Sequence, residues 1–224
     1  MRTILLFLVL LAGMAGTTTV RAQESAERRE AANQQIREKA AAWTAELNLS
    51  DEAKAARVAG VIAGHQIAVR DFHNEHPASL VPDGINPRTG EKMNNVEKQV
   101  FINSTKPASV HENLMNGLRA DLTEEQVEYI LDKYTVGKVA FTMKAYREII
   151  TDLTPEEDET ILGYLKQARE QAVDYKNMNM ISQIFEIYKT KSELFLYQTG
   201  RNWKQIYRDY VRRLNEEKAR ANPQ

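Results

Sequence analysis

The chain has 224 residues, contains 30 Lys and Arg against 31 Asp and Glu, and has no cysteine. The lack of cysteine excludes disulfides, thiolate metal sites and thiol nucleophiles, and a formal charge of -1 gives no indication of a nucleic-acid partner or of an anionic membrane surface. The length is sufficient to bury an apolar core without covalent cross-links.

The first 22 residues have the three parts of a secretory signal peptide. Arg2 supplies a positive charge, an apolar run follows from Ile4 to Leu11, and Val20-Arg21-Ala22 forms a small-residue cleavage site. The apolar run is too short to span a membrane. The sequence therefore predicts export, with a mature chain that begins at Gln23, is periplasmic or extracellular, and has no membrane span.

Two regions follow the predicted signal peptide. Residues 23–46 are rich in Ala, Glu, Arg and Gln, which are strong helix formers, but they contain few apolar anchors. We interpret this region as an N-terminal helical arm. Residues 47–224 carry apolar residues at helical spacing along most of their length, and they are predicted to form a single helical domain.

Local signals indicate where several helices of this domain begin and end. Thr123 and Thr154 are followed three residues later by Gln126 and Glu157, so that each pair can form a capping box. Gly200 stands where a C-terminal helix cap prefers glycine. Alternation with a period of two, which is typical of strands, is absent. The expected fold is therefore all-α, a compact bundle of about seven or eight helices.

One long connection interrupts the helical pattern. The segment from Pro77 to Asn95 contains three prolines and two glycines, which favour turns and oppose regular hydrogen bonding. A connection of this length inside a domain is usually functional or mobile. We expect this Pro/Gly-rich loop to be the most mobile internal segment.

The helix predicted after Thr154 carries a charge within its apolar side. At about 100° per residue, Arg169 lies on the same side as Leu165 and Ala168. A buried guanidinium needs an acidic partner, which we expect on a different helix, with Asp71 as the first candidate. In the alternative interpretation, Arg169 presents its planar set of donors to a ligand in a cleft.

The histidines differ in their surroundings. His65 lies on the apolar side of its predicted helix, and we expect it to be a buried core residue. His73 and His76 are three residues apart but lack a third ligand, so no metal site is predicted. No cofactor fingerprint is present either. His73 and His111, from two different helices, form either a polar bridge or a binding or acid/base site.

Several motifs resemble those of a known family. They are Ala168-Arg169-Glu170, Ala172, Asp174, Phe185, Tyr188-Lys189, Leu196 and Gly200, with Asp71-Phe72-His73 and Val110-His111 in the first half of the chain. The family consists of exported bacterial helical proteins catalogued as a domain of unknown function with a sugar-binding tag. The chain departs from the family pattern in the long loop and at Arg201-Asn202, where we expect an aromatic residue and an aspartate.

Our leading hypothesis is a polar cleft that binds a carbohydrate-like or acidic small ligand, a class that the resemblance implies, and we expect binding rather than catalysis. The residues expected to line it are Asp71, His73, His111, Arg169, Tyr188 and Lys189. One alternative is a periplasmic chaperone, because Leu122 to Gln126 resembles the LTxxQ motif of such proteins. Another is a hydrolase or lyase acting on polysaccharide, with one of the two histidines as base. The sequence identifies no catalytic residue and leaves the oligomeric state open.

Overall fold

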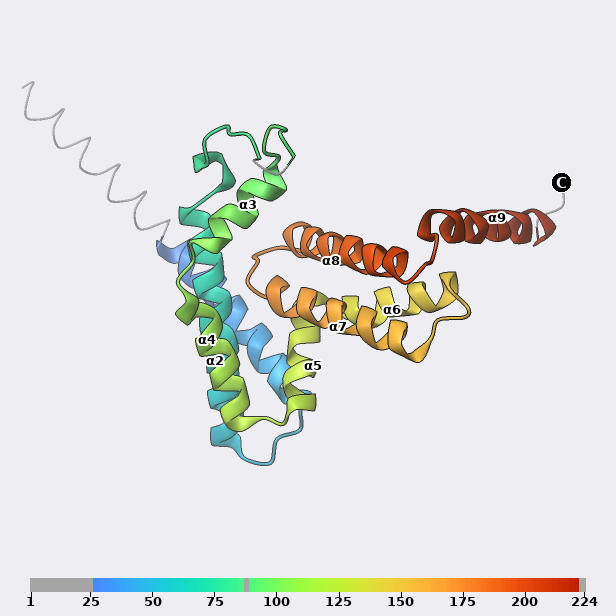
Figure 1. Ribbon diagram of the computed structural model, residues 1–224. Helices are drawn as coiled ribbons and strands as arrows, with labels where there is room; N and C mark the ends of the chain where they lie inside the picture. Colours follow the sequence, from blue (N-terminus) through green and yellow to red (C-terminus); the bar gives the residue numbers. More distant parts are fainter. Residues whose placement is uncertain (1–25, 87–88, 222–224) are drawn as a thin grey trace, which may run out of the picture. The chain divides into compact units, whose positions relative to one another are not determined.

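Helices make up most of the computed structural model, which describes residues 26–86 and 89–221 (Figure 1). The predicted signal peptide, residues 1–22, lies outside the described residues. Between the described residues no strand forms, and the only strand-like feature is an isolated bridge between Ile85 and Lys92. The prediction of an all-α fold is therefore confirmed.

The described residues form nine α-helices, slightly more than expected. A helix over residues 26–45 comes first. It is followed by α2 (Glu52–Glu75), the short 3-10 helix η1 (Ala78–Leu80), α3 (Asn95–Ser104), α4 (Ala108–Asp121), α5 (Glu124–Thr135), α6 (Lys138–Ile149), α7 (Pro155–Ala172), α8 (Met178–Gln198) and α9 (Trp203–Ala221).

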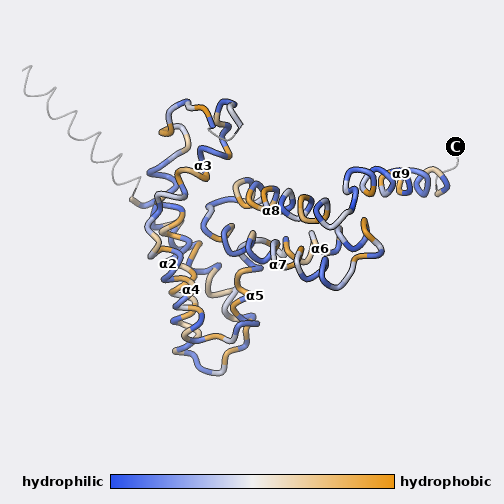
Figure 2. The backbone as a smooth tube through the Cα atoms, in the orientation of Figure 1, coloured by the Kyte–Doolittle hydropathy of each residue, from blue (hydrophilic) through white to orange (hydrophobic). Residues whose placement is uncertain are grey.

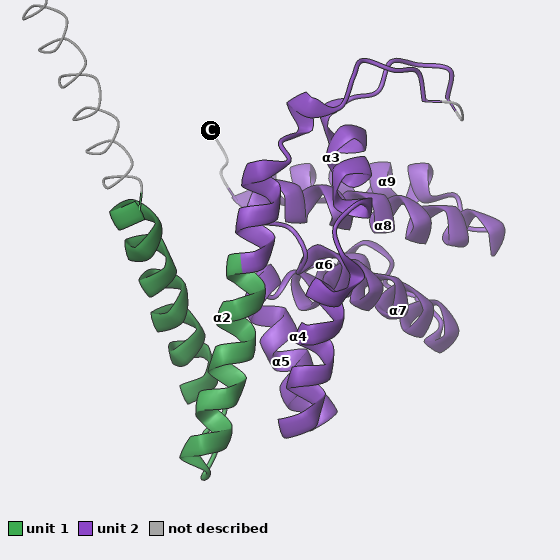
Figure 3. Ribbon diagram, turned by 90° about the vertical axis from the view of Figure 1, so that its left-hand side faces the viewer, with its two compact units in different colours: residues 1–67 green, residues 68–224 purple. Residues whose placement is uncertain are grey.

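The chain divides into two compact units, residues 1–67 and 68–224 (Figure 3). The boundary falls inside α2, whereas the sequence predicts that a single domain starts at residue 47. In the first unit the buried side chains include Ala40, Thr44 and His65. The burial of His65, which is 4% exposed, confirms its predicted place in a core. All residues discussed below as a site belong to the second unit.

The helix starts follow from local hydrogen bonds. Thr123 and Gln126 form the predicted capping box at α5, with Thr123 N donating to Gln126 Oε1 at 3.1 Å. Thr154 and Glu157 form the predicted capping box at α7, with Thr154 N donating to Glu157 Oε2 at 2.9 Å. Between α5 and α6 the backbone turns through Val136, which caps the end of α5, and Gly137, which precedes α6; both have positive φ.

The core of the second unit is formed by the apolar sides of α6, α7 and α8. Helix α7 contributes Ile161, Leu165, Ala168 and Ala172, all fully buried. Hydrophobic and hydrophilic residues alternate along these helices with the spacing of amphipathic helices (Figure 2). Burial of one side of α7 fixes the direction of its other residues, including the acidic groups at its two ends.

The Pro/Gly-rich loop contains more backbone hydrogen bonds than its composition led us to expect. Asn86 N donates to Glu91 O at 2.8 Å, and Met93 N donates to Gly84 O at 2.9 Å. The carboxylate of Asp83 contacts the amines of Lys92, at the end of the turn, and of Lys98, in α3, which holds the pKa of Asp83 at about 2. The mobility of this loop stays a prediction.

Candidate functional site

Three segments far apart in sequence meet at Asp174, which follows α7. His73, near the end of α2, places its Nε2 atom 3.0 Å from the backbone oxygen of Asp174. His111, in the first turn of α4, places its Nδ1 atom 3.2 Å from Oδ2 of the same residue. The two histidines that the sequence analysis singled out therefore lie on either side of one aspartate.

A lysine that sequence reasoning missed also contacts this aspartate. Lys106 Nζ lies 3.1 Å from Asp174 Oδ2, and the lysine side chain is only 4% exposed. The Asp174 carboxylate thus balances a buried ammonium and an imidazole. Lys106 lies in the short connection between α3 and α4, where no periodic pattern distinguishes a buried lysine from an exposed one.

His111 is the accessible member of this group. Its side chain is 27% exposed, and its Nε2 atom lies 3.6 Å from Glu170 Oε1 on α7. The Asp174 carboxylate raises the pKa of His111 above its usual value, against the lowering effect of burial. The imidazole thus lies between two carboxylates, with Nδ1 at ion-pair distance from Asp174 but without hydrogen-bond geometry, and with Nε2 on the side of Glu170.

His73 is the buried member. Burial lowers the pKa of His73, and the ring stacks on Tyr175 at a centroid distance of 5.6 Å. Burial also raises the pKa of Tyr175 to about 12. Asn103 lies close enough to affect the pKa of both residues, yet its Oδ1 atom and the Tyr175 hydroxyl lack a partner with hydrogen-bond geometry among the described residues. The lowered pKa favours the neutral form of His73, which contacts the backbone oxygen of Asp174.

Arg169 is buried, as predicted, but it lies apart from the histidines. Its side chain is 4% exposed, and Nη1 donates to Asp132 Oδ1 on α5 at 2.9 Å. Glu128, also on α5, lies 3.5 Å from Nη2. The partner is therefore on a different helix, as expected, but the choice of Asp71 is wrong. The Asp71 carboxylate is instead 2.7 Å from the neighbouring Arg70, while α5 supplies the acidic groups beside α7.

The two predicted residues on α8 have different surroundings. Tyr188 is half-buried; burial raises the pKa of Tyr188, and the charge of Glu170 adds to the shift. Lys189 instead forms an ion pair with Glu186 on its own helix at 2.7 Å. Of this predicted pair, the tyrosine lies near the histidine group and the lysine contacts another carboxylate.

These contacts define a group of side chains that we call the polar strip. It consists of His111, Gln167, Glu170, Tyr188 and Lys191. Glu170 is half-exposed, its Oε1 atom lies 3.6 Å from His111 Nε2, and its charge acts on the Tyr188 hydroxyl. Lys191 Nζ donates to Gln167 Oε1 at 3.3 Å and lies 5.6 Å from the centre of the Tyr188 ring. The strip thus combines donors, acceptors and an aromatic ring on three helices.

His76, which lies three residues after His73, has contacts of its own. His76 Nδ1 lies 2.9 Å from the backbone oxygen of Phe72 and its ring stacks on the Phe72 ring. Within residues 26–86 and 89–221, no group of three or more His, Asp or Glu side chains has the arrangement of a metal site. In the same ranges, no helix has both the length and the apolar character needed to cross a membrane.

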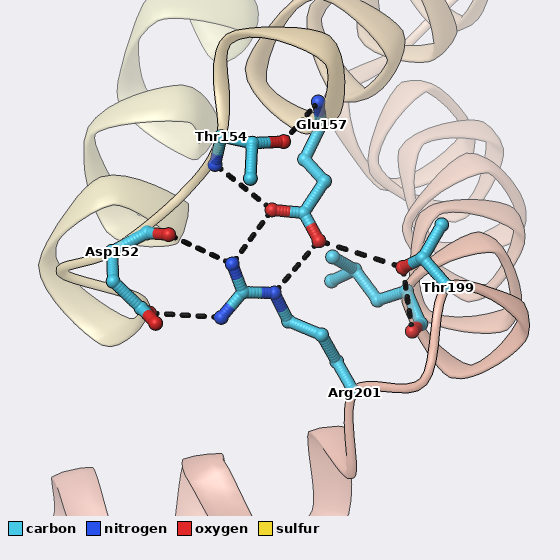
Figure 4. Close-up of polar contacts among 6 residues, drawn as sticks. Asp152, Thr154, Glu157, Thr199 and Arg201 are labelled. Atoms are coloured by element: carbon cyan, nitrogen blue, oxygen red, sulfur yellow. Dashed lines mark hydrogen bonds and ion pairs between the residues drawn. The ribbon is translucent and has the colours of Figure 1, made fainter.

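The departure from the family pattern at Arg201 has a structural explanation (Figure 4). Arg201 Nε and Nη2 donate to the two carboxylate oxygens of Glu157, each at 2.7 Å. Nη1 donates to Asp152 Oδ1 at 2.8 Å, and Nη2 also donates to the Asp152 backbone oxygen at 2.7 Å. Arg201 lowers the pKa of Glu157 to about 2. We call this group the Arg201 clasp.

The protein is all-α in its described residues, and the polar strip lies on three of its helices. The chain is a member of the family described as "Protein of unknown function (DUF3826)", whose family model matches residues 33–216. The match spans the clasp, the histidine group and most of α9. No curated protein matches the chain.

Proposed function

We propose that the protein binds a polyhydroxylated, carbohydrate-like ligand at the polar strip. The observation that carries the proposal is the position of Glu170. Its half-exposed carboxylate lies 3.6 Å from His111 Nε2, and its charge helps to raise the pKa of Tyr188 on α8. A carboxylate accepts two hydroxyl groups, and an aromatic ring offers an apolar surface to the C–H side of a sugar ring.

The orientation of His111 supports the same ligand class. Asp174 Oδ2 lies 3.2 Å from Nδ1, so the carboxylate attracts the charged form of the imidazole from that side while Nε2 lies on the other side of the ring. Gln167 and Lys191 add an amide and an ammonium beside the ring. A neutral sugar suits this set better than an acidic ligand, because an anion would be repelled by the Glu170 carboxylate.

Only some of the six residues expected from the sequence to line the site belong to the proposed binding site. His111 and Tyr188 belong to the strip, and His73 supports Asp174 from behind. The other three have different contacts, since Asp71 contacts Arg70, Arg169 contacts α5, and Lys189 contacts Glu186. We assign those three no contact with the ligand.

A second candidate is an enzyme that acts on polysaccharide. His111 is the candidate general base, because its Nδ1 atom lies 3.2 Å from the Asp174 carboxylate, which raises the pKa of His111 above its usual value. Catalysis would require a substrate whose reacting proton comes within hydrogen-bond reach of Nε2. The chaperone hypothesis has less support, since Thr123 and Gln126 of the LTxxQ segment form an ordinary capping box.

A glycan array probed with the mature chain tests binding, followed by calorimetry with each glycan that binds. We expect Glu170→Gln and Tyr188→Ala to weaken binding by about tenfold or more, as for loss of a good contact at a binding hot spot. Glu159→Gln is the matched control, because Glu159 is an exposed carboxylate on the same helix. Binding that survives Glu170→Gln unchanged would place the ligand elsewhere.

The same glycans separate binding from catalysis. After prolonged incubation, product analysis detects either hydrolysis or elimination. Products that form with the wild type and not with His111→Gln would support the enzyme. Intact glycans together with loss of affinity in Glu170→Gln would support a binding protein.

A further inference from the structure

Helix α9 carries a second group of residues that the polar strip leaves unexplained. None of its side chains is fully buried, and it contains six Lys and Arg against three Asp and Glu. Figure 2 shows that hydrophilic residues predominate along it. The excess of positive charge contrasts with the whole chain, whose formal charge is -1.

One side of α9 packs on the rest of the second unit. Trp203 and Ile206 contact the core, and the Trp203 ring lies 5.4 Å from that of Tyr146 on α6. Further along, Tyr210 and Leu214 line an open hollow of about 280 Å³ together with Glu148. This inner side accounts for most of the apolar residues of the helix.

Beside this packed side lies an exposed one, which begins at Tyr207, whose ring is 5.9 Å from that of Trp203, and we call it the outer strip. It consists of Lys204, Tyr207, Arg208, Val211, Arg212 and Lys218. These residues are three, four or seven positions apart, so at about 100° per residue they share one side of the helix. Tyr207 is 47% exposed and Val211 is 36% exposed. None of the three acidic residues of α9 falls within this side of the helix.

The charges of the outer strip are only partly balanced. Arg212 forms an ion pair with Asp209 at 2.9 Å, and Arg208 donates to the neutral Gln205. In the part of the chain that the structure describes, no carboxylate lies within ion-pair distance of Lys204, Arg208 or Lys218. The outer strip therefore presents net positive charge around two exposed apolar side chains.

We infer that the outer strip of α9 docks on a membrane surface that contains anionic phospholipids. An amphipathic helix with a basic border lies in the plane of such a surface, where its cations meet the phosphate groups and its apolar side chains enter the headgroup region. The charge alone would fit any polyanion. Tyr207 and Val211 favour the lipid, because a purely polar polyanion offers their exposed surface no apolar environment.

This docking requires no membrane span and is independent of the proposed ligand. The inner side of α9 keeps its contacts with α6 and α8 while the outer strip faces the lipid. The second unit would therefore bind as a folded body. Its contact with the membrane would be reversible and sensitive to salt.

Co-sedimentation of the mature chain with vesicles tests the inference. We expect partitioning to be about tenfold or more stronger on phosphatidylcholine vesicles that contain phosphatidylglycerol than on pure phosphatidylcholine, because each cation near an anionic surface adds to binding. The double variant Lys204→Gln/Arg208→Gln should lose about that factor. The matched control Arg213→Gln/Arg220→Gln removes the same charge from the other side of the same helix and should retain most binding.

A third variant tests the apolar part. Tyr207→Ser/Val211→Ser leaves every charge in place and should weaken vesicle binding several-fold, and circular dichroism checks that all three variants stay helical. Equal losses in the two charge variants, or equal binding to neutral and anionic vesicles, would overturn the inference. So would an unchanged Tyr207→Ser/Val211→Ser variant, or binding to an anionic polysaccharide without binding to vesicles.

Discussion

Both ends of α7 carry a glutamate that contacts a basic side chain, but only the glutamate at the first turn has its hydrogen-bonding capacity filled within the protein. At the first turn, Arg201 donates four hydrogen bonds to Glu157 and Asp152, and Glu157 is almost fully buried. At the other end, Glu170 is half-exposed beside His111. A saturated ion pair has no capacity for a ligand, whereas a partly exposed, oriented group has. The comparison separates a structural contact from a candidate binding site within one helix.

The largest loss of stability should come from replacing Arg201, in the clasp at the first turn of α7. Arg201→Met leaves the Glu157 carboxylate buried without its partner, so we expect the free energy of unfolding to fall by about 3 to 5 kcal/mol. Urea denaturation measures it. Arg147→Met is the matched control, since Arg147 also forms a two-point contact with a carboxylate of the first turn, Asp158, but is 56% exposed. Its loss should lower the free energy of unfolding far less, because water screens an exposed ion pair. Equal losses would contradict the assignment of the clasp as buried.

Arg169→Met should have an intermediate effect on stability. The arginine is buried, but its partners Asp132 and Glu128 are 39% and 42% exposed, so water can solvate both carboxylates once the guanidinium is removed. We expect a loss of about 1 to 3 kcal/mol in urea denaturation. Glycan binding should stay unchanged, because the polar strip is not touched. A variant with normal stability and lost binding would return Arg169 to the ligand site.

The clasp should also make the stability of the protein depend on pH in the acid range. Because Arg201 lowers the pKa of Glu157 from 4.5 to about 2, the native state holds this carboxylate ionised more strongly than the unfolded state does. The stabilisation is complete above pH 4.5 and is lost as the pH falls toward 2. Stability measured by urea titration across this range should fall less steeply in Glu157→Gln than in the wild type. Parallel pH profiles would show that the clasp does not set the pKa of Glu157.

The histidine group should change the stability by a smaller amount, and this contribution should be lost as the pH rises, not as it falls. Because Asp174 raises the pKa of His111, its contribution to stability is present below pH 6.5 and is lost as the pH rises through the folded-state pKa. Burial shifts His73 the other way. Titration of the imidazole signals by NMR should therefore give a pKa above 6.5 for His111 and below 6.5 for His73. Two pKa values on the same side of 6.5 would remove the distinction between an accessible and a supporting histidine.

Sequence reasoning succeeded where the cause is local. The capping boxes at Thr123 and Thr154 depend on residues three positions apart, and the burial of Arg169 depends on the period of a single helix. The partner of Arg169 depends on which helix packs beside α7, and helix periodicity does not contain that information. Asp71 was a reasonable acidic candidate, but its neighbour Arg70 contacts it.

The same limit applies to the candidate site. His111 and Tyr188 were identified through a resemblance in sequence, whereas Lys106 had no signal because its burial arises only when α3, α4 and the end of α7 come together. The helical period of α7 places Glu170 away from its apolar side, and the residue is exposed. That exposure is also what makes it available to a ligand.

The position of Arg201 has a mechanical consequence. The residue lies directly before α9, beyond a left-handed turn at Gly200. A force applied at the C-terminus would first unwind the end of α9, since none of its side chains is fully buried and its contacts with the core are at Trp203 and Ile206. The force would then reach Arg201, whose four hydrogen bonds to Glu157 and Asp152 bear load together. The clasp would thus confine extension to the last helix and shield the core from tension.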